Sequence, residues 1–91
     1  MSSNLISHRS EIDKIDKEIS ELLKKRFAVC QHIGAEKKHS PMKNVAFSDP
    51  VREQAVLDQV VSVTHCQRSQ KAILDVYQAI FSASIKLQQE V

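Results

Sequence analysis

The sequence predicts an all-α fold of three helices, a long first helix and two shorter ones, in a chain that forms an intertwined helical-bundle homodimer. The 91 residues include one Gly and two Pro, so the chain has few places to turn. Apolar residues recur at helical spacing in three segments, at about residues 5–38, 50–65 and 69–90. We therefore expect a single domain over residues 1–91, with a loop at residues 39–49.

The first segment has a heptad pattern, with apolar residues at two positions of each repeat. One position holds Ile12, Ile19 and Ile33, and the other holds Ile15, Leu22 and Val29. Arg26 falls into the first position, seven residues after Ile19 and seven before Ile33. Because a buried, unpaired charge is costly, this arginine requires a partner or an anionic ligand.

The second segment begins with Asp49 and Pro50, which suit an N-cap and the first helical turn. Its apolar stripe consists of Val56, Leu57, Val60, Val61 and Val63. Glu53 lies three residues before Val56 and four before Leu57, so it shares their inward face. An ionisable group therefore points where an aliphatic one is expected.

The third segment also has polar residues on its inner face, namely Ser84 and Gln88. The apolar residues of that face are Ile73, Val76, Tyr77, Ile80, Phe81 and Leu87. A single buried Ser or Gln is usually a satisfied structural group. Polar residues in all three apolar stripes instead predict one shared polar pocket within the helical core.

Composition argues against several other classes of protein. The formal net charge is +2, from 13 basic and 11 acidic residues, which is too balanced for a nucleic-acid surface. Cys30 and Cys66 are too far apart for a C-x-x-C pair, and we expect both to be small buried thiols. Without a signal-peptide pattern or an apolar run that could span a bilayer, a cytoplasmic protein is favoured. We expect no metal and no catalytic role for the scattered histidines, His8, His32, His39 and His65.

The length of the first helix predicts the second chain. About 34 helical residues extend roughly 50 Å, whereas a compact chain of this size is only about 30 Å across. Arg26 and Lys37 are eleven residues apart, which places them on nearly the same face, so both can reach one small ligand. Arg9 lies roughly 25 Å from Arg26 along the helix, so it either reaches that ligand from a second chain or is an exposed arginine near the start of the helix.

Five short motifs follow one another along nearly the whole chain. They are R-x-x-I-D-x-I-D at Arg9–Asp16, L-L-x-x-R at Leu22–Arg26, I-G-x-x-K at Ile33–Lys37, D-x-x-R-E at Asp49–Glu53 and S-x-x-x-Q at Ser84–Gln88. In this order and spacing, the chain resembles the all-helical (type II) chorismate mutases. It departs from the compact members in a longer loop between the third and fourth motifs.

The resemblance implies an isomerase of the shikimate pathway and of aromatic amino-acid biosynthesis. Enzymes of that family convert chorismate to prephenate by an intramolecular Claisen rearrangement, without cofactor or metal. The protein holds the flexible dianion in a chair-like pose and stabilises the charge that develops on the breaking ether oxygen. The resemblance further implies that the partners are chorismate and a second copy of the chain, with neither nucleic acid nor membrane.

The resemblance also assigns roles to residues. Arg26, with Arg9 from the second chain, corresponds to the pair that clamps the substrate carboxylates, and guanidinium geometry suits that task. Lys37 and Gln88 correspond to the donors to the ether oxygen, and Ser84 to a further carboxylate contact. Because Gln88 donates without first being protonated, its presence in place of Glu implies activity at neutral pH.

The second helix supplies the remaining roles. Glu53 and the region of Asp49 correspond to the group that binds the ring hydroxyl, and Arg52 adds positive potential nearby. The resemblance therefore implies catalytic roles for Arg26, Lys37, Glu53 and Gln88, and binding roles for these four together with Arg9, Asp49, Arg52 and Ser84.

Two alternatives remain open from the sequence. An isochorismate pyruvate-lyase of the same fold shares the arginine clamp, the lysine and the glutamine, but Ser84 and the D-x-x-R-E motif favour the mutase. A non-catalytic dimeric helical regulatory module is disfavoured because Arg26, Lys37, Glu53 and Gln88, which destabilise an empty core, are all present. The longer loop also leaves room for an activating partner enzyme that orders it.

Overall fold

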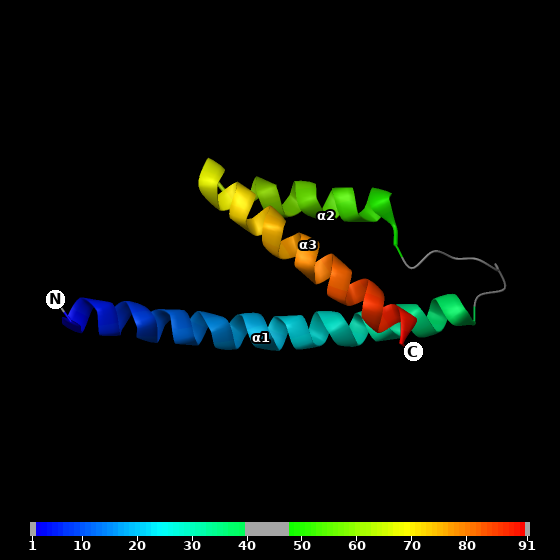
Figure 1. The fold of residues 1–91 in the computed structure, drawn as a ribbon, viewed down its shortest axis with the longest axis horizontal. Coiled ribbons are helices and arrows are strands. Elements are labelled where there is room, and N and C mark those ends of the chain that lie inside the picture. Colours follow the sequence, from blue (N-terminus) through cyan, green and yellow to red (C-terminus); the bar gives the residue numbers. More distant parts are fainter. Residues whose placement is uncertain (1, 40–47, 91) are drawn as a thin grey trace.

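The chain forms three α-helices in a computed structural model that describes residues 2–39 and 48–90. The helices are α1 (Ser2–Lys38), α2 (Pro50–Ser62) and α3 (Gln67–Gln89), shown in Figure 1. The described residues contain no strand, so the all-α prediction is confirmed for them. The expected loop at residues 39–49 falls, for residues 40–47, outside the described part of the chain.

Hydrogen bonds at the helix ends explain where the boundaries differ from those expected. The side chain of Asp49 accepts a hydrogen bond from the backbone N–H of Arg52 at 3.1 Å, so α2 begins at Pro50 as predicted. The helix ends at Ser62, three residues early, because the hydroxyls of Ser62 and Thr64 donate to carbonyl oxygens of the last turn.

The start of α3 is stabilised by the side chain of Gln70 rather than by that of its N-cap residue. The N-cap, Cys66, makes no capping hydrogen bond through its side chain, and the helix begins two residues before the expected residue 69. Gln70, in the first turn, donates from its side-chain amide to the backbone carbonyl of Thr64 at 2.8 Å. This bond ties the end of one helix to the beginning of the next.

The third helix lies between the other two and contacts both. Figure 1 shows the C-terminal end of α3 crossing the C-terminal part of α1, while its N-terminal part runs beside α2. The buried residues of α3 are Phe81, Ser84 and Gln88, and Tyr77 packs edge-on against Phe81 with the ring centroids 5.9 Å apart. The covered part of the molecule is therefore small and includes two polar side chains.

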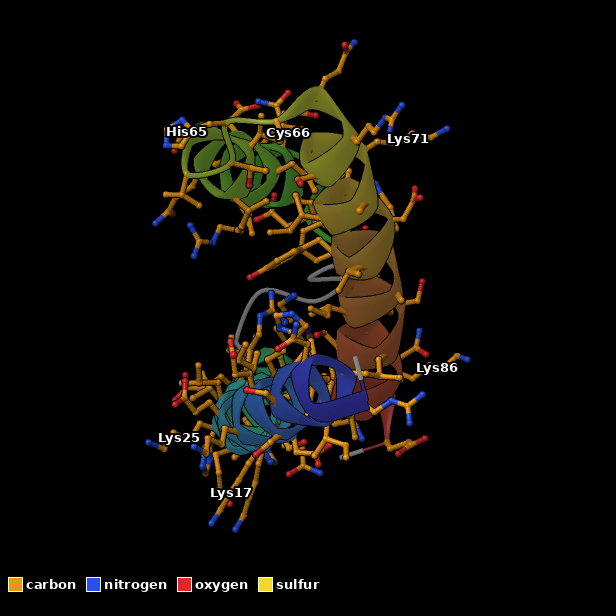
Figure 2. All side chains as sticks on the ribbon, turned by 90° about the vertical axis from the view of Figure 1, so that its left-hand side faces the viewer. Lys17, Lys25, His65, Cys66, Lys71 and Lys86 are labelled. Carbon is orange, nitrogen blue, oxygen red and sulfur yellow. The ribbon has the colours of Figure 1, made fainter. Side chains whose placement is uncertain are left out.

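Three residues expected in the core are exposed. Val63 follows the last residue of α2 and is 70% exposed, so it is not part of the helix face. Val76 is 56% exposed because it lies beside the face of α3 that Tyr77 and Phe81 occupy. Cys66 is exposed because it lies in the connection between α2 and α3, at the opposite end of the molecule from α1 (Figure 2). Cys30 is buried as expected.

The chain alone is elongated. It measures 61 × 26 × 15 Å and has a radius of gyration of 16.9 Å, against about 12 Å for a compact chain of this length. The N-terminal part of α1 extends beyond α2 and α3, and Lys17 projects away from both (Figures 1 and 2). Within the described residues, every helix is too short or too polar to serve as a membrane span.

The apolar stripe of α1 is left uncovered over most of its length. Its members are between 40% and 63% exposed: Leu5, Ile12, Ile15, Ile19, Leu22, Val29 and Ile33. An exposed apolar stripe of this length marks an interaction site.

Candidate active site

A cavity of about 570 Å³ lies where the C-terminal half of α1, the beginning of α2 and the C-terminal half of α3 face one another. This volume is typical of a site for a small molecule. Seven of the eight residues expected at the site line the cavity: Arg26, Lys37, Asp49, Arg52, Glu53, Ser84 and Gln88. The eighth, Arg9, is exposed near the other end of α1.

Arg26 is held in the cavity by residues from two helices. Its Nη1 donates a hydrogen bond to Oγ of Ser84 at 2.6 Å, and the Ser84 hydroxyl in turn donates to the carbonyl of Ile80 at 2.7 Å. The guanidinium carbon lies 5.9 Å from the centroid of the Phe81 ring, within the range of a cation–π contact. Sγ of Cys30, one turn along α1, is 3.8 Å from the same Nη1.

No carboxylate in the described part of the chain comes within ion-pair distance of Arg26. The side chain is partly buried, and Ser84 satisfies only one of the five guanidinium N–H donors. A partly buried cation in this situation favours an anionic ligand, because such a ligand offsets the cost of desolvating the charge.

Lys37 and Gln88 form the second polar contact between α1 and α3. Nζ of Lys37 donates to Oε1 of Gln88 at 3.0 Å, and Gln88 is 8% exposed. Because Lys37 donates to the amide oxygen of Gln88, the N–H groups on Nε2 of Gln88 remain to donate to another acceptor. The contact therefore fixes which end of the amide is a donor.

The beginning of α2 forms the opposite wall. Glu53 is half-buried and lines the cavity. Its Oε2 accepts a hydrogen bond from Oγ of Ser48 at 3.4 Å. Asp49 caps the helix through Oδ1, and Arg52 is exposed at the rim. This wall thus carries two carboxylates and one guanidinium. Across the cavity lie the cations of α1, Arg26 and Lys37.

The family model for chorismate mutase type II matches residues 8–89. The chain belongs to this family. The match spans α2 and α3 entirely, α1 from His8 onward, and every predicted site residue, Arg9 included. Neither the curated proteins nor the solved structures include a match to this chain.

The cavity also contains residues that the sequence did not assign to the site. The apolar lining comes from Val29, Cys30, Ile33, Val56, Phe81 and Ile85. The spacing offered a signal for all six, since each lies three or four residues from a predicted site residue on the same helix, as Cys30 does from Arg26 and Phe81 from Ser84. Lys25, which also lines the cavity, is adjacent to Arg26 and had no such signal.

The histidines and Cys66 lie outside the cavity. His8 is 3.9 Å from Glu11, and His65 lies beside Cys66 at the α2–α3 connection (Figure 2). The pKa of the Cys66 thiol is lowered because the nearby backbone N–H groups of Ser69 and Arg68, in the first turn of α3, favour the thiolate. Among the described residues, no three His, Cys, Asp or Glu side chains gather closely enough to bind a metal ion.

Proposed function

We propose that this chain is a chorismate mutase, which rearranges chorismate to prephenate in aromatic amino-acid biosynthesis. One observation carries the proposal. The cavity between α1, α2 and α3 contains a partly buried arginine with no carboxylate partner among the described residues, together with a lysine bonded to a buried glutamine. This arrangement suits an organic anion that has an oxygen acceptor away from its carboxylate.

The guanidinium of Arg26 binds a carboxylate of chorismate in this proposal. Ser84 orients the guanidinium by accepting from Nη1, and Phe81 packs beside it. A bidentate pair between guanidinium and carboxylate fixes direction as well as distance, so it restricts the substrate to a compact pose. Restricting a flexible reactant to a near-reactive conformer lowers the entropic part of the barrier.

Lys37 and Gln88 act on the ether oxygen. That oxygen gains negative charge as the bond to the ring breaks, so donors placed around it stabilise the transition state more than the substrate. The Lys37–Gln88 bond supports this role because it turns the Nε2 of Gln88 into the available donor. Glu53, on the facing wall, accepts from the ring hydroxyl.

The working unit is a homodimer in this proposal. The apolar stripe of α1 is uncovered in the single chain, and a second copy of α1 has the matching surface. A second chain also supplies the missing cation, since Arg9 lies outside the cavity of its own chain. Each cavity then has Arg26 from one chain and Arg9 from the other.

Product analysis tests the proposed reaction. The purified protein is incubated with chorismate and, separately, with isochorismate, and each reaction is compared with one that lacks protein. We expect accelerated formation of prephenate from chorismate and little turnover of isochorismate. Salicylate and pyruvate from isochorismate would instead assign the lyase activity, and inertness toward both substrates would refute both activities for the chain on its own.

A further inference from the structure

We propose that Gly34 is a positioning residue, which sets the approach of α1 to α3 and thereby places the amide of Gln88 against Lys37. The catalytic part of this inference rests on the proposed function, whereas the packing part stands without it.

Gly34 touches the main chain of Gln88. A Cβ added at Gly34 would lie 2.5 Å from the carbonyl oxygen of Gln88, 2.7 Å from its Cα and 3.0 Å from its carbonyl carbon. Ordinary contact with a Cβ begins at about 3.4 Å. Because these are backbone atoms, no side-chain rotation relieves the contact, and the last turn of α3 would have to move away from α1 by about 1 Å.

The position of this contact connects packing with chemistry. Gly34 is buried in α1, and Lys37 follows it by three residues on nearly the same face. The residue that Gly34 touches on α3 is Gln88 itself, which accepts from Lys37 at 3.0 Å. This close approach of the two helices therefore coincides with the proposed donors to the ether oxygen.

Helix propensity indicates that this glycine has a specific reason to be there. Glycine is disfavoured in a helix interior relative to alanine, and Gly34 is the only glycine of the chain, four residues before the end of α1. If the site had room for a methyl group, Gly34→Ala would stabilise the protein. The sign of the stability change thus reports whether the close approach exists.

The first measurements are the melting temperature, kcat and KM for chorismate of Gly34→Ala. We expect a lower melting temperature despite the better helix propensity, and kcat reduced about 100-fold, since a shift of about 1 Å can cost that much. KM should change by less than about threefold, because the displaced donors act mainly on the charge of the transition state. Ala28→Gly, at an exposed position of α1, is the matched control and should lower the melting temperature with kcat unchanged.

Repeating the Gly34→Ala substitution in a Gln88→Ala variant distinguishes a positioning role from a general loss of structure. In Gln88→Ala the main-chain contact remains but the amide is gone. Adding Gly34→Ala should therefore again lower the melting temperature but should not reduce kcat further. Running the reactions in sucrose stabilises a weakly folded variant, so that its activity can be measured. Each kcat is divided by the folded fraction, which circular dichroism measures.

Each outcome decides the inference. A melting temperature that is unchanged or raised by Gly34→Ala would overturn the close approach. The same kcat loss with and without the Gln88 side chain would overturn the positioning role. A parent protein that leaves chorismate unchanged would refute the proposed function instead, and the melting temperatures would still decide the packing of Gly34.

Discussion

The two halves of α1 have the same heptad pattern but different surroundings. In the C-terminal half, α3 covers one face of the helix, where Arg26, Cys30, Gly34 and Lys37 face Ser84 and Gln88, while Val29 and Ile33 of the apolar stripe stay 56% and 40% exposed. In the N-terminal half, the described residues of the stripe are exposed as well, and neither α2 nor α3 covers that part of the helix (Figure 1). A regular apolar pattern therefore predicts that a face is to be buried, but it does not say whether the covering surface comes from the same chain.

The largest expected effect comes from removing the cation of the covered half. Arg26→Ala should lower kcat/KM for chorismate about 1,000-fold, since losing one partner of a buried charged contact costs about 4 kcal/mol. The folded structure should survive because the substitution removes a cation with no ion-pair partner among the described residues. Steady-state kinetics and circular dichroism measure the two outcomes.

Lys24→Ala is the matched control for that variant, because Lys24 is exposed on the same helix and does not line the cavity. Its kinetics should equal those of the parent. Normal turnover by Arg26→Ala would remove the basis for the whole site assignment.

The uncovered half is tested by placing a charge in its apolar stripe. Ile15→Asp should weaken the dimer about 100-fold in Kd, since each of two chains loses roughly 1.5 kcal/mol of apolar burial. Sedimentation over a range of concentrations measures this effect. Ser20→Asp introduces the same side chain at an exposed position of α1 that is not one of the two apolar heptad positions. This variant should leave the dimer intact. If both variants sediment like the parent, the stripe is not the interface.

Mixing two inactive variants tests whether the N-terminal half of α1 in one chain completes the site at the C-terminal half of α1 in the other. A hybrid dimer of Arg9→Ala and Lys37→Ala chains contains one site with both native residues, so full exchange of equal amounts should restore about a quarter of the parent activity. The recovered rate is measured after subunit exchange has been verified. Absence of recovery would show that Arg9 does not complete the cavity of the second chain.

The smallest expected effect is a shift of the pH profile within the covered half. In Gln88→Glu, the introduced carboxyl donates to the ether oxygen only while it is protonated. Activity should therefore be greatest at acid pH and fall as the pH rises through the pKa of that carboxyl, which the neighbouring Lys37 lowers. The measurement is kcat/KM as a function of pH.

Gln89→Glu is the control, since Gln89 is exposed next to Gln88 and does not line the cavity. Its profile should match that of the parent. An unchanged profile for Gln88→Glu as well would place Gln88 away from the ether oxygen.

Periodicity within each helix determined most of what the sequence alone could supply. Apolar spacing predicted the three helices, and the polar residues that interrupt it, Arg26, Ser84 and Gln88, lie in or beside the small covered region. Two of the core predictions failed where a local hydrogen bond or a connection ends the pattern. Val63 follows the end of α2, and Cys66 lies between helices, so neither has a helical face to share.

Only the tertiary structure decided the contacts between residues far apart in the chain. The Arg26–Ser84 and Lys37–Gln88 bonds join residues 58 and 51 positions apart, and their geometry depends on how α3 crosses α1. The close approach of Gly34 to Gln88 has no signal in the spacing, because a glycine in a helix has the same appearance in the sequence whatever faces it. The sequence by itself thus determined which faces are apolar and which polar groups interrupt them. The crossing of the helices determined which of those groups meet, because contact distances depend on the relative placement of elements that no local pattern encodes.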